Sequence, residues 1–140
     1  MGPSLKNFAL VNHQRKHAIN NGELCNFLKS LIPELGIGRR EFSVVFITDE
    51  RIRQFNRHYR GYDKATDVLS FRGDGKYLGD ILISSETAYN QSRKSNKLSF
   101  ESNVHRLVLH GLLHLMGYDH ETDNGEMRTI ERRLRRRFQC

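Results

Sequence analysis

The segment from residue 99 to 116 constrains the fold of this chain more than any other part of the sequence. Ser99 opens a helical pattern in which apolar residues recur three and four positions apart, as on one helix face. From Leu107 onward, Leu109 and Leu113 place further apolar side chains on the other flank. A helix that is apolar on most of its sides belongs in a protein core. We therefore expect the rest of the chain to pack around this helix.

Four short apolar segments predict the strands of a sheet. Phe42–Ile47 is rich in β-branched residues and is typical of a buried strand. Val68–Phe71 and Leu78–Ser84 flank a Gly-Asp-Gly sequence, which is typical of a hairpin turn. Leu5–Val11 is a further predicted strand. With the helices, these strands predict an α+β fold in which helices cover a small mixed sheet of about four strands.

Two helices are predicted in the first half of the chain. The spacing of apolar residues predicts one over Gly22–Ile32, which we expect Pro33 to end because proline cannot continue a helix. Asp49 is the expected N-cap of the second helix. The residues that this helix would turn inward are Ile52, Phe55 and Tyr59.

Two more helices are predicted in the second half, besides the buried one. Ser84 or Ser85 would cap a helix that runs towards Lys94. Asp123 and Glu126 resemble a capping box for a final helix. The apolar stripe of that helix consists of Met127, Ile130, Leu134 and Phe138.

The length and composition of the chain are those of one globular domain that spans residues 1–140. Its 140 residues are 37% hydrophobic and 28% charged, and no run approaches the roughly 20 apolar residues of a membrane helix. The N-terminus lacks the apolar core of a secretory signal and the chain has only two cysteines, so we expect a cytoplasmic protein. A net charge of +7 favours a polyanionic partner.

The most informative motif lies where the buried helix ends. His110 and His114 are four residues apart, so their imidazoles would share one helix face. Gly117 can adopt a left-handed conformation that ends the helix and brings His120 back to the same point. Three neutral histidines leave one position of a tetrahedral zinc ion open, as in catalytic sites. We therefore predict one zinc ion per chain at these three residues, although imidazole also suits nickel and iron.

This spacing equals that of the metzincin peptidases, H-E-x-x-H-x-x-G-x-x-H, except at one position. Gly111 stands where these enzymes carry the glutamate that acts as general base. A glycine can neither accept nor donate a proton, which argues against peptide hydrolysis. Two alternatives stay open: a metallopeptidase with a different base, and a non-catalytic ribosome assembly factor with a structural zinc. The open fourth ligand position argues against the second of them.

The segment from His110 to His120, HGLLHLMGYDH, resembles the signature of the YbeY family of metal-dependent endoribonucleases. Two upstream segments support the resemblance: Tyr59–Phe71, YRGYDKATDVLSF, and Leu78–Ser84, LGDILIS. The resemblance implies an α+β fold, a zinc ion held by three histidines and an arginine that faces the metal cleft, which maps onto Arg60. It also implies an endoribonuclease that cleaves single-stranded segments of rRNA, in maturation of the 16S 3′ end and in ribosome quality control. The expected partners are then rRNA and the small ribosomal subunit, with no membrane and no organic cofactor.

The other residues of the matching segments have more than one interpretation. Arg60 suits a phosphodiester because its planar, permanently charged guanidinium matches phosphate oxygens. Asp80 and Asp119 are expected either to orient a histidine or to cap a turn. Thr66 and Ser70 are ambiguous between structure and substrate contact, and no residue stands out as a general base.

The final helix carries more arginines than acidic residues. Such a surface attracts RNA phosphates in a salt-dependent and sequence-independent way. The residues expected to contact RNA are Arg132, Arg133, Arg136 and Arg137. The alternative is a solvated helix face, on which Glu126 and Glu131 pair with arginines about four positions away.

Overall fold

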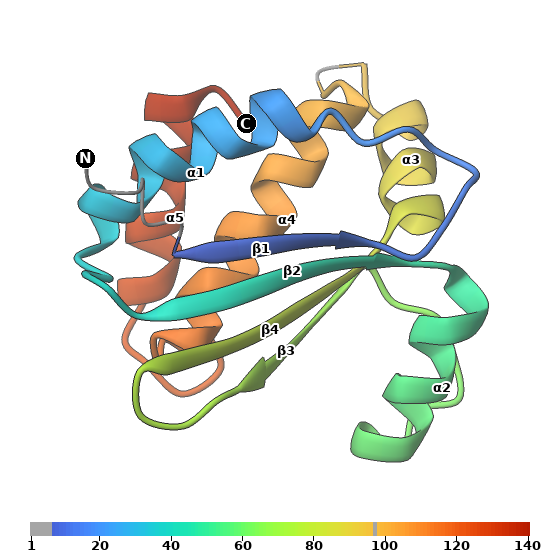
Figure 1. Cartoon of the computed structure of the whole chain (residues 1–140), viewed down its shortest axis with the longest axis horizontal. Helices are drawn as coiled ribbons and strands as arrows, with labels where there is room; N and C mark the ends of the chain where they lie inside the picture. Colours follow the sequence, from blue (N-terminus) through green and yellow to red (C-terminus); the bar gives the residue numbers. More distant parts are fainter. Residues whose placement is uncertain (1–6, 97) are drawn as a thin grey trace.

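The computed structural model of the chain describes residues 7–96 and 98–140 and has the predicted α+β architecture (Figure 1). The strands are β1 (Phe8–Asn12), β2 (Glu41–Ile47), β3 (Val68–Arg72) and β4 (Tyr77–Ser84). The helices are α1 (Asn21–Leu35), α2 (Asp49–Arg60), α3 (Ser85–Lys94), α4 (Phe100–Leu115) and α5 (Glu126–Phe138). Within the described residues, the strands form one sheet in the order β1-β2-β4-β3. The sheet is mixed, because β1, β2 and β4 are parallel and β3 is antiparallel to β4 at one edge.

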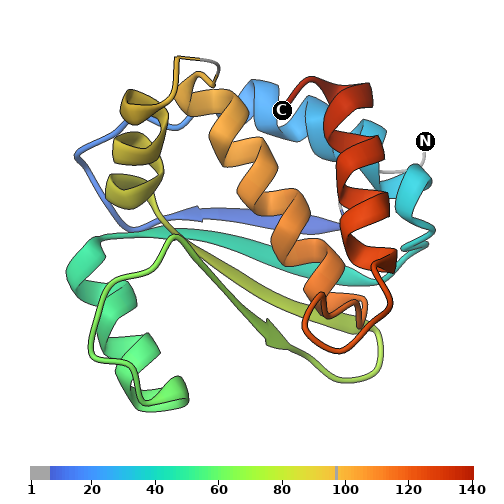
Figure 2. The ribbon, with the colours of Figure 1, turned by 180° about the vertical axis from the view of Figure 1, so that it is seen from behind.

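The two faces of the sheet are covered to different extents (Figures 1 and 2). Helices α1, α3, α4 and α5 lie on one face, and α2 lies on the other. Successive residues of a strand point to opposite faces. Phe42, Val44 and Phe46 of β2 therefore pack into the main core with the helices, whereas Val45 and Ile47 belong to a smaller apolar cluster with α2.

Helix α4 lies in the middle of the helical layer, as its apolar sequence predicts. It packs against β3, β4, α1, α3 and α5. The Ser99 hydroxyl caps it by accepting a hydrogen bond from the Ser102 N–H. The leucines and valine that are 1% exposed or less are Leu107, Val108, Leu109, Leu112 and Leu113. The predicted buried helix is confirmed, and it carries the histidine motif from the core to the surface.

The predicted end of α1 at Pro33 is wrong. Pro33 lies inside the helix, which continues to Leu35 and ends at Gly36 in a left-handed conformation. A proline removes one backbone hydrogen bond of the helix. The last turn keeps its helical form because Ile32 and Leu35 pack against the core, and the Gly36 N–H donates to the carbonyl of Pro33.

The predicted N-caps of α2 and α5 are each displaced by one or two residues. Thr48 caps α2 by accepting the Arg51 N–H, so Asp49 is the first residue of the helix. Gly125 occupies the cap position of α5. Asp123 still satisfies an N–H of the first turn, since its carboxylate accepts a hydrogen bond from Met127 at 3.0 Å.

Only part of the predicted inward face of α2 is buried. Ile52 is buried and Phe55 is half-buried, but Tyr59 is 60% exposed. Tyr59 lies in the last turn of α2, which reaches only the edge strand β3, where Phe71 contacts the tyrosine ring. The expectation that Tyr59 faces the core is therefore wrong.

The other predicted elements are confirmed, with boundaries that shift by at most one residue except at the start of the first strand. β3 and β4 form the expected hairpin, and Ser84 caps α3. β1 begins at Phe8, and residues 5 and 6 of the predicted first strand lie outside the described residues. In the described part of the chain, no helix has the length and apolar character needed to cross a membrane.

Candidate metal centre

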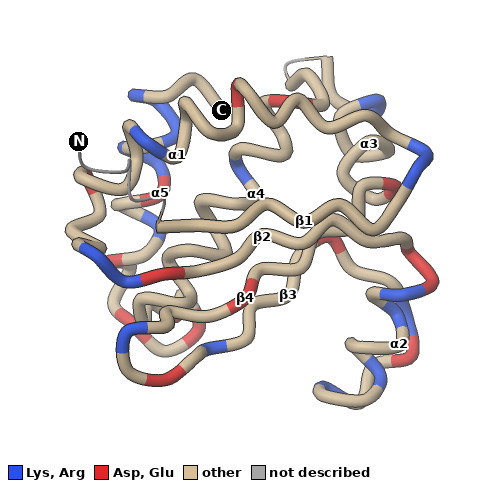
Figure 3. Tube along the Cα trace, in the orientation of Figure 1, with Lys and Arg blue, Asp and Glu red and all other residues tan. Residues whose placement is uncertain are grey.

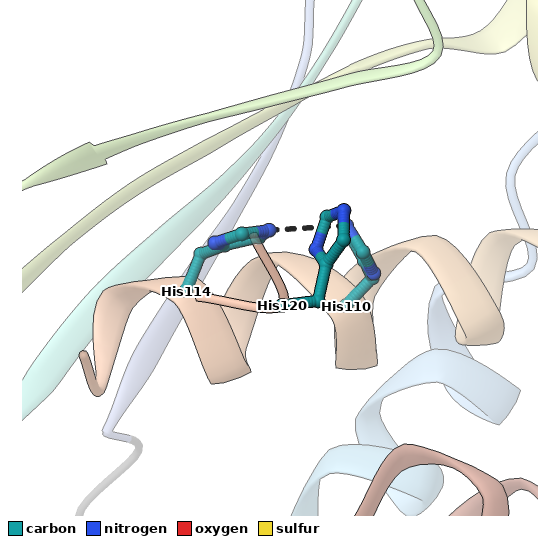
Figure 4. A group of neighbouring side chains, drawn as sticks. All are labelled: His110, His114 and His120. Carbon is teal, nitrogen blue, oxygen red and sulfur yellow. Dashed lines mark hydrogen bonds between the residues drawn. The ribbon is translucent and has the colours of Figure 1, made fainter. Parts of the chain in front are cut away.

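The three histidines of the motif converge at the C-terminal end of α4 (Figure 4). His110 and His114 lie one turn apart on the helix. Gly117 follows with a φ of 103°, a left-handed conformation that residues with a side chain rarely adopt. The chain reverses there, and His120 returns to the end of the helix. One ring nitrogen from each of the three histidines lies within 4.8 Å of the others.

The ring nitrogens of His110 and His114 have the spacing that a metal ion needs. The Nε2 atoms of His110 and His114 are 3.2 Å apart. Two ligands of a tetrahedral zinc ion, at about 2.0–2.1 Å from the metal, would be roughly 3.3 Å apart. Burial, helped by the neighbouring His110 and His120, holds the pKa of His114 below its usual range. That imidazole is therefore neutral near pH 7 and keeps the free lone pair that a metal ligand uses.

A carboxylate that sequence analysis did not select holds the ring of His110. The Nδ1 atom of His110 lies 2.8 Å from a carboxylate oxygen of Glu131 on α5. A carboxylate in this position fixes the ring and leaves its Nε2 atom facing the other histidines. The sequence contains a signal for the partial burial of Glu131, but none for its partner. Glu131 follows Met127 by four residues and precedes Leu134 by three, so it lies beside the buried stripe of α5 and not on its solvated face.

The two aspartates considered for this role are engaged elsewhere. Asp80 lies on the face of the sheet that α2 covers, where it accepts hydrogen bonds from the hydroxyls of Ser43 and Tyr77. Asp119 caps the turn after α4, since its carboxylate accepts the Glu121 N–H at 3.0 Å. Of the two roles considered for Asp119, the turn role has this direct support.

Gly111 lies where α4 packs closely on the sheet. A Cβ atom at this position would be 2.7 Å from a methyl carbon of Ile81 and 3.1 Å from the hydroxyl of Ser70. The Ser70 hydroxyl also donates to the Gly111 carbonyl at 3.2 Å. A glutamate could enter here only by displacing Ile81. The packing of the helix therefore accounts for the glycine.

A hollow of about 670 Å³ opens beside the histidines. Arg60, from the end of α2, lines this hollow together with all three histidines. The structure thus brings together the four residues predicted for the metal site and its facing arginine. Thr66 and Ser70 line the same hollow, the latter with the structural hydrogen bond to α4. Sequence analysis missed Arg72, which also lines the hollow and whose Nε donates to the His114 carbonyl at 3.4 Å.

The four arginines predicted to contact RNA do not form one group. Arg132 and Arg136 line a separate hollow of about 500 Å³ on α5. Its other lining residues are Arg128, Glu131, Arg135 and Cys140. Arg133 is exposed and does not line this hollow, and Arg137 forms an ion pair with Glu34 at 2.7 Å. The structure therefore separates the predicted set into two pairs.

Comparison with known proteins settles the family of the chain. A family model described as "Endoribonuclease YbeY" matches residues 9–139. The chain belongs to the endoribonuclease YbeY family. The endoribonuclease YbeY of Aquifex aeolicus is 40% identical over 126 residues, which cover 86% of this chain and 83% of that protein. The endoribonuclease YbeY of Geobacter sulfurreducens is 37% identical over 139 residues, which cover 93% of this chain and 92% of that protein.

A solved structure supports the same assignment at the level of the fold. The chain is similar to the solution structure of TM1509 from Thermotoga maritima, with a TM-score of 0.63 and 27% sequence identity. The match covers 91% of this chain and 85% of the other. The fold that the YbeY resemblance implies is therefore the fold that this chain has.

Proposed function

We propose that this protein is a zinc-dependent endoribonuclease that cleaves single-stranded RNA. The observation that carries the proposal is the shared hollow, which is lined by the three histidines and by Arg60. Three neutral imidazoles add no negative charge, so a bound divalent ion would keep its full positive charge. That charge and the guanidinium of Arg60 both suit an anionic phosphodiester.

The residues of the proposed site have different roles. His110, His114 and His120 would hold the metal, and Glu131 would keep the His110 ring in position. A zinc ion bound there would supply Lewis-acid polarisation of a phosphoryl oxygen and lower the pKa of a bound water to about 7. Arg60 would bind the reacting phosphate and stabilise the charge that builds up on its oxygens. This makes Arg60 the proposed catalytic residue among the arginines of the hollow.

The biological substrate that we propose is rRNA. The family resemblance supports a role in 16S 3′-end maturation and ribosome quality control, with the small ribosomal subunit as partner, in the cytoplasm. The net charge of +7 is consistent with a polyanionic substrate. We further propose that residues 1–140 act as a single catalytic domain.

The metallopeptidase alternative has less support. A peptidase of this spacing carries a glutamate after the first histidine, and the contact of Gly111 with Ile81 leaves no space for one. A structural zinc in a non-catalytic assembly factor is also less well supported. A structural site is normally closed by four protein ligands, whereas the cluster found among the described residues has three.

The proposal is tested with highly purified, zinc-loaded protein and a labelled single-stranded RNA. We expect cleavage that a chelator suppresses, and no turnover of unfolded casein. The His114→Ala variant should hold well below one zinc per chain by elemental analysis and should cleave nothing. The exposed His13, which lies outside the metal site, supplies the matched control: His13→Ala should keep both zinc and activity.

Two results would contradict the proposal. Full zinc occupancy in the His114→Ala variant would show that the metal ligands are wrongly assigned. Cleavage of casein with intact RNA would instead favour the peptidase.

A further inference from the structure

Two exposed aromatic side chains flank Arg60 in the sequence and at the surface. Tyr59 is 60% exposed and Tyr62 is 52% exposed. Tyr59 lies in the last turn of α2, and Tyr62 follows two residues after the helix ends. Helix α2 projects from the face of the sheet that it covers, which we call the α2 face (Figures 1 and 2). Exposed aromatic rings on both sides of a residue that lines the metal hollow point to a ligand with flat, apolar surfaces.

The ring of Tyr62 is held against the arginine itself. Gly61 ends α2 in a left-handed conformation, with a φ of 77°, so that the chain turns after the helix. The guanidinium carbon of Arg60 then lies 5.2 Å from the centre of the Tyr62 ring. The Nζ atom of Lys64 lies 5.8 Å from the same centre. Two cations and one exposed ring therefore lie together at the end of α2.

The ring of Tyr59 is held by two other aromatic rings. It lies 5.0 Å from Phe71 and 6.2 Å from Phe55, measured between ring centres. These three aromatic residues line an apolar hollow of about 680 Å³ on the α2 face of the sheet. Edge strand β3 separates this hollow from the metal hollow, because Phe71 lines the first and its neighbours Ser70 and Arg72, which point to the other face, line the second. Tyr59 thus lines the apolar hollow, and the next residue, Arg60, lines the metal hollow.

The charges around these rings favour a polyanion as the ligand. Helix α2 carries several arginines (Figure 3). Arg53 is neutralised by Asp63 at 2.8 Å, whereas Arg51, Arg60 and Lys64 lie against aromatic rings. Proteins that bind single-stranded nucleic acids combine such cations, which follow the backbone, with aromatic rings on which bases stack. A purely apolar protein ligand would make no favourable interaction with the cations beside the rings.

We propose that the rings of Tyr59 and Tyr62 stack nucleobases of single-stranded RNA on either side of the phosphate that Arg60 binds. The proposal rests on the proposed endoribonuclease function and adds a cause for its strand preference. Bases of a duplex are already stacked and paired, so only an unpaired strand can offer them to these rings. The two tyrosines are positioning residues and take no part in the chemical step.

The test compares ring removal with ring retention. Tyr59→Leu and Tyr62→Leu remove the aromatic ring, and Tyr59→Phe and Tyr62→Phe keep it. Binding of a labelled single-stranded oligoribonucleotide is measured with chelator-stripped protein, so that no cleavage occurs. Each leucine variant should bind roughly 5- to 150-fold more weakly, which converts to about 1–3 kcal/mol per stacked base. Each phenylalanine variant should bind within about twofold of the original protein, since the stacking surface is retained.

A second measurement separates stacking from a loss of structure. Oligoribonucleotides that carry single abasic sites lack the proposed partner of one ring. The wild-type protein should lose affinity for one such RNA, and the matching leucine variant should lose no more. Tyr77→Leu is the matched control, because Tyr77 is 40% exposed but lies at the start of β4, where its hydroxyl contacts Asp80. This control should leave RNA affinity unchanged.

The outcomes distinguish this proposal from the function on which it rests. If wild-type protein neither binds nor cleaves RNA, the proposed function fails. If it cleaves RNA but the leucine variants bind normally, only the stacking proposal is overturned, and the apolar hollow is left to a protein ligand. Equal weakening on intact and abasic RNA would also overturn it, because a stacking ring requires its base.

Discussion

The hollow at the end of α4 and the outer face of α5 differ in how their polar and charged side chains are held. At the hollow, His110 and His114 emerge from the C-terminal half of α4, where most of the other residues are buried leucines, and each has a defined neighbour. On α5, several arginines are exposed, and of the predicted four only Arg137 has an ion pair within the described residues, with Glu34. A polar residue in an apolar setting needs a specific partner, whereas a solvated one does not. Substitutions in the hollow should therefore have large single effects, and those on α5 should have small effects that accumulate.

Substitution of Arg60 is expected to have a much larger effect on activity than any substitution on α5. Arg60→Ala should lower kcat by about 10²–10³-fold, because one preorganised donor to the developing charge is lost. Zinc content should not change, since Arg60 lies in the hollow but outside the histidine cluster. Steady-state kinetics and elemental analysis measure the two quantities. A normal kcat would remove Arg60 from the catalytic role and would make it resemble the arginines of α5.

Glu131 belongs to both regions, because it lies on α5 and contacts His110. Glu131→Ala should weaken zinc binding by about 10- to 100-fold, as for other carboxylates behind a metal-ligating histidine. Competition with a chelating dye measures the affinity. The exposed Glu121 of the turn after α4 is the matched control, and Glu121→Ala should bind zinc normally. Equal zinc affinity in both variants would leave Glu131 as a residue of the α5 surface only.

The smallest effects are expected on α5, where the structure divides the arginines into pairs. Arg132→Gln with Arg136→Gln should flatten the dependence of RNA binding on log salt, by up to about 0.7 for each lost phosphate contact. The double substitution of Arg133→Gln and Arg137→Gln should change this salt dependence less, because Arg137 is already paired with Glu34. The rate at saturating RNA should be unchanged in both. An unaltered salt slope in a variant with all four substitutions would show that this face of α5 is a solvated surface that does not contact RNA.

Local patterns in the sequence were sufficient for the elements that depend on short-range geometry. The buried α4, the β3–β4 hairpin and the convergence of the three histidines follow from spacings of a few residues and from one glycine. The errors lie where a contact from elsewhere in the chain decided the outcome. Packing carried α1 past Pro33, and the limited width of the sheet left Tyr59 exposed.

The sequence by itself therefore determined the α+β class, the buried helix and the cluster that could hold a metal ion. Periodicity and the restricted conformations of glycine act within one or two turns of chain, so they are visible in a linear pattern. Only the tertiary structure decided which carboxylate supports His110, whereas the place of Arg60 beside the histidines was already implied by the family resemblance. Glu131 and His110 are 21 positions apart, and they meet because α5 packs against α4. The packing of whole elements sets such contacts, and no local spacing encodes it.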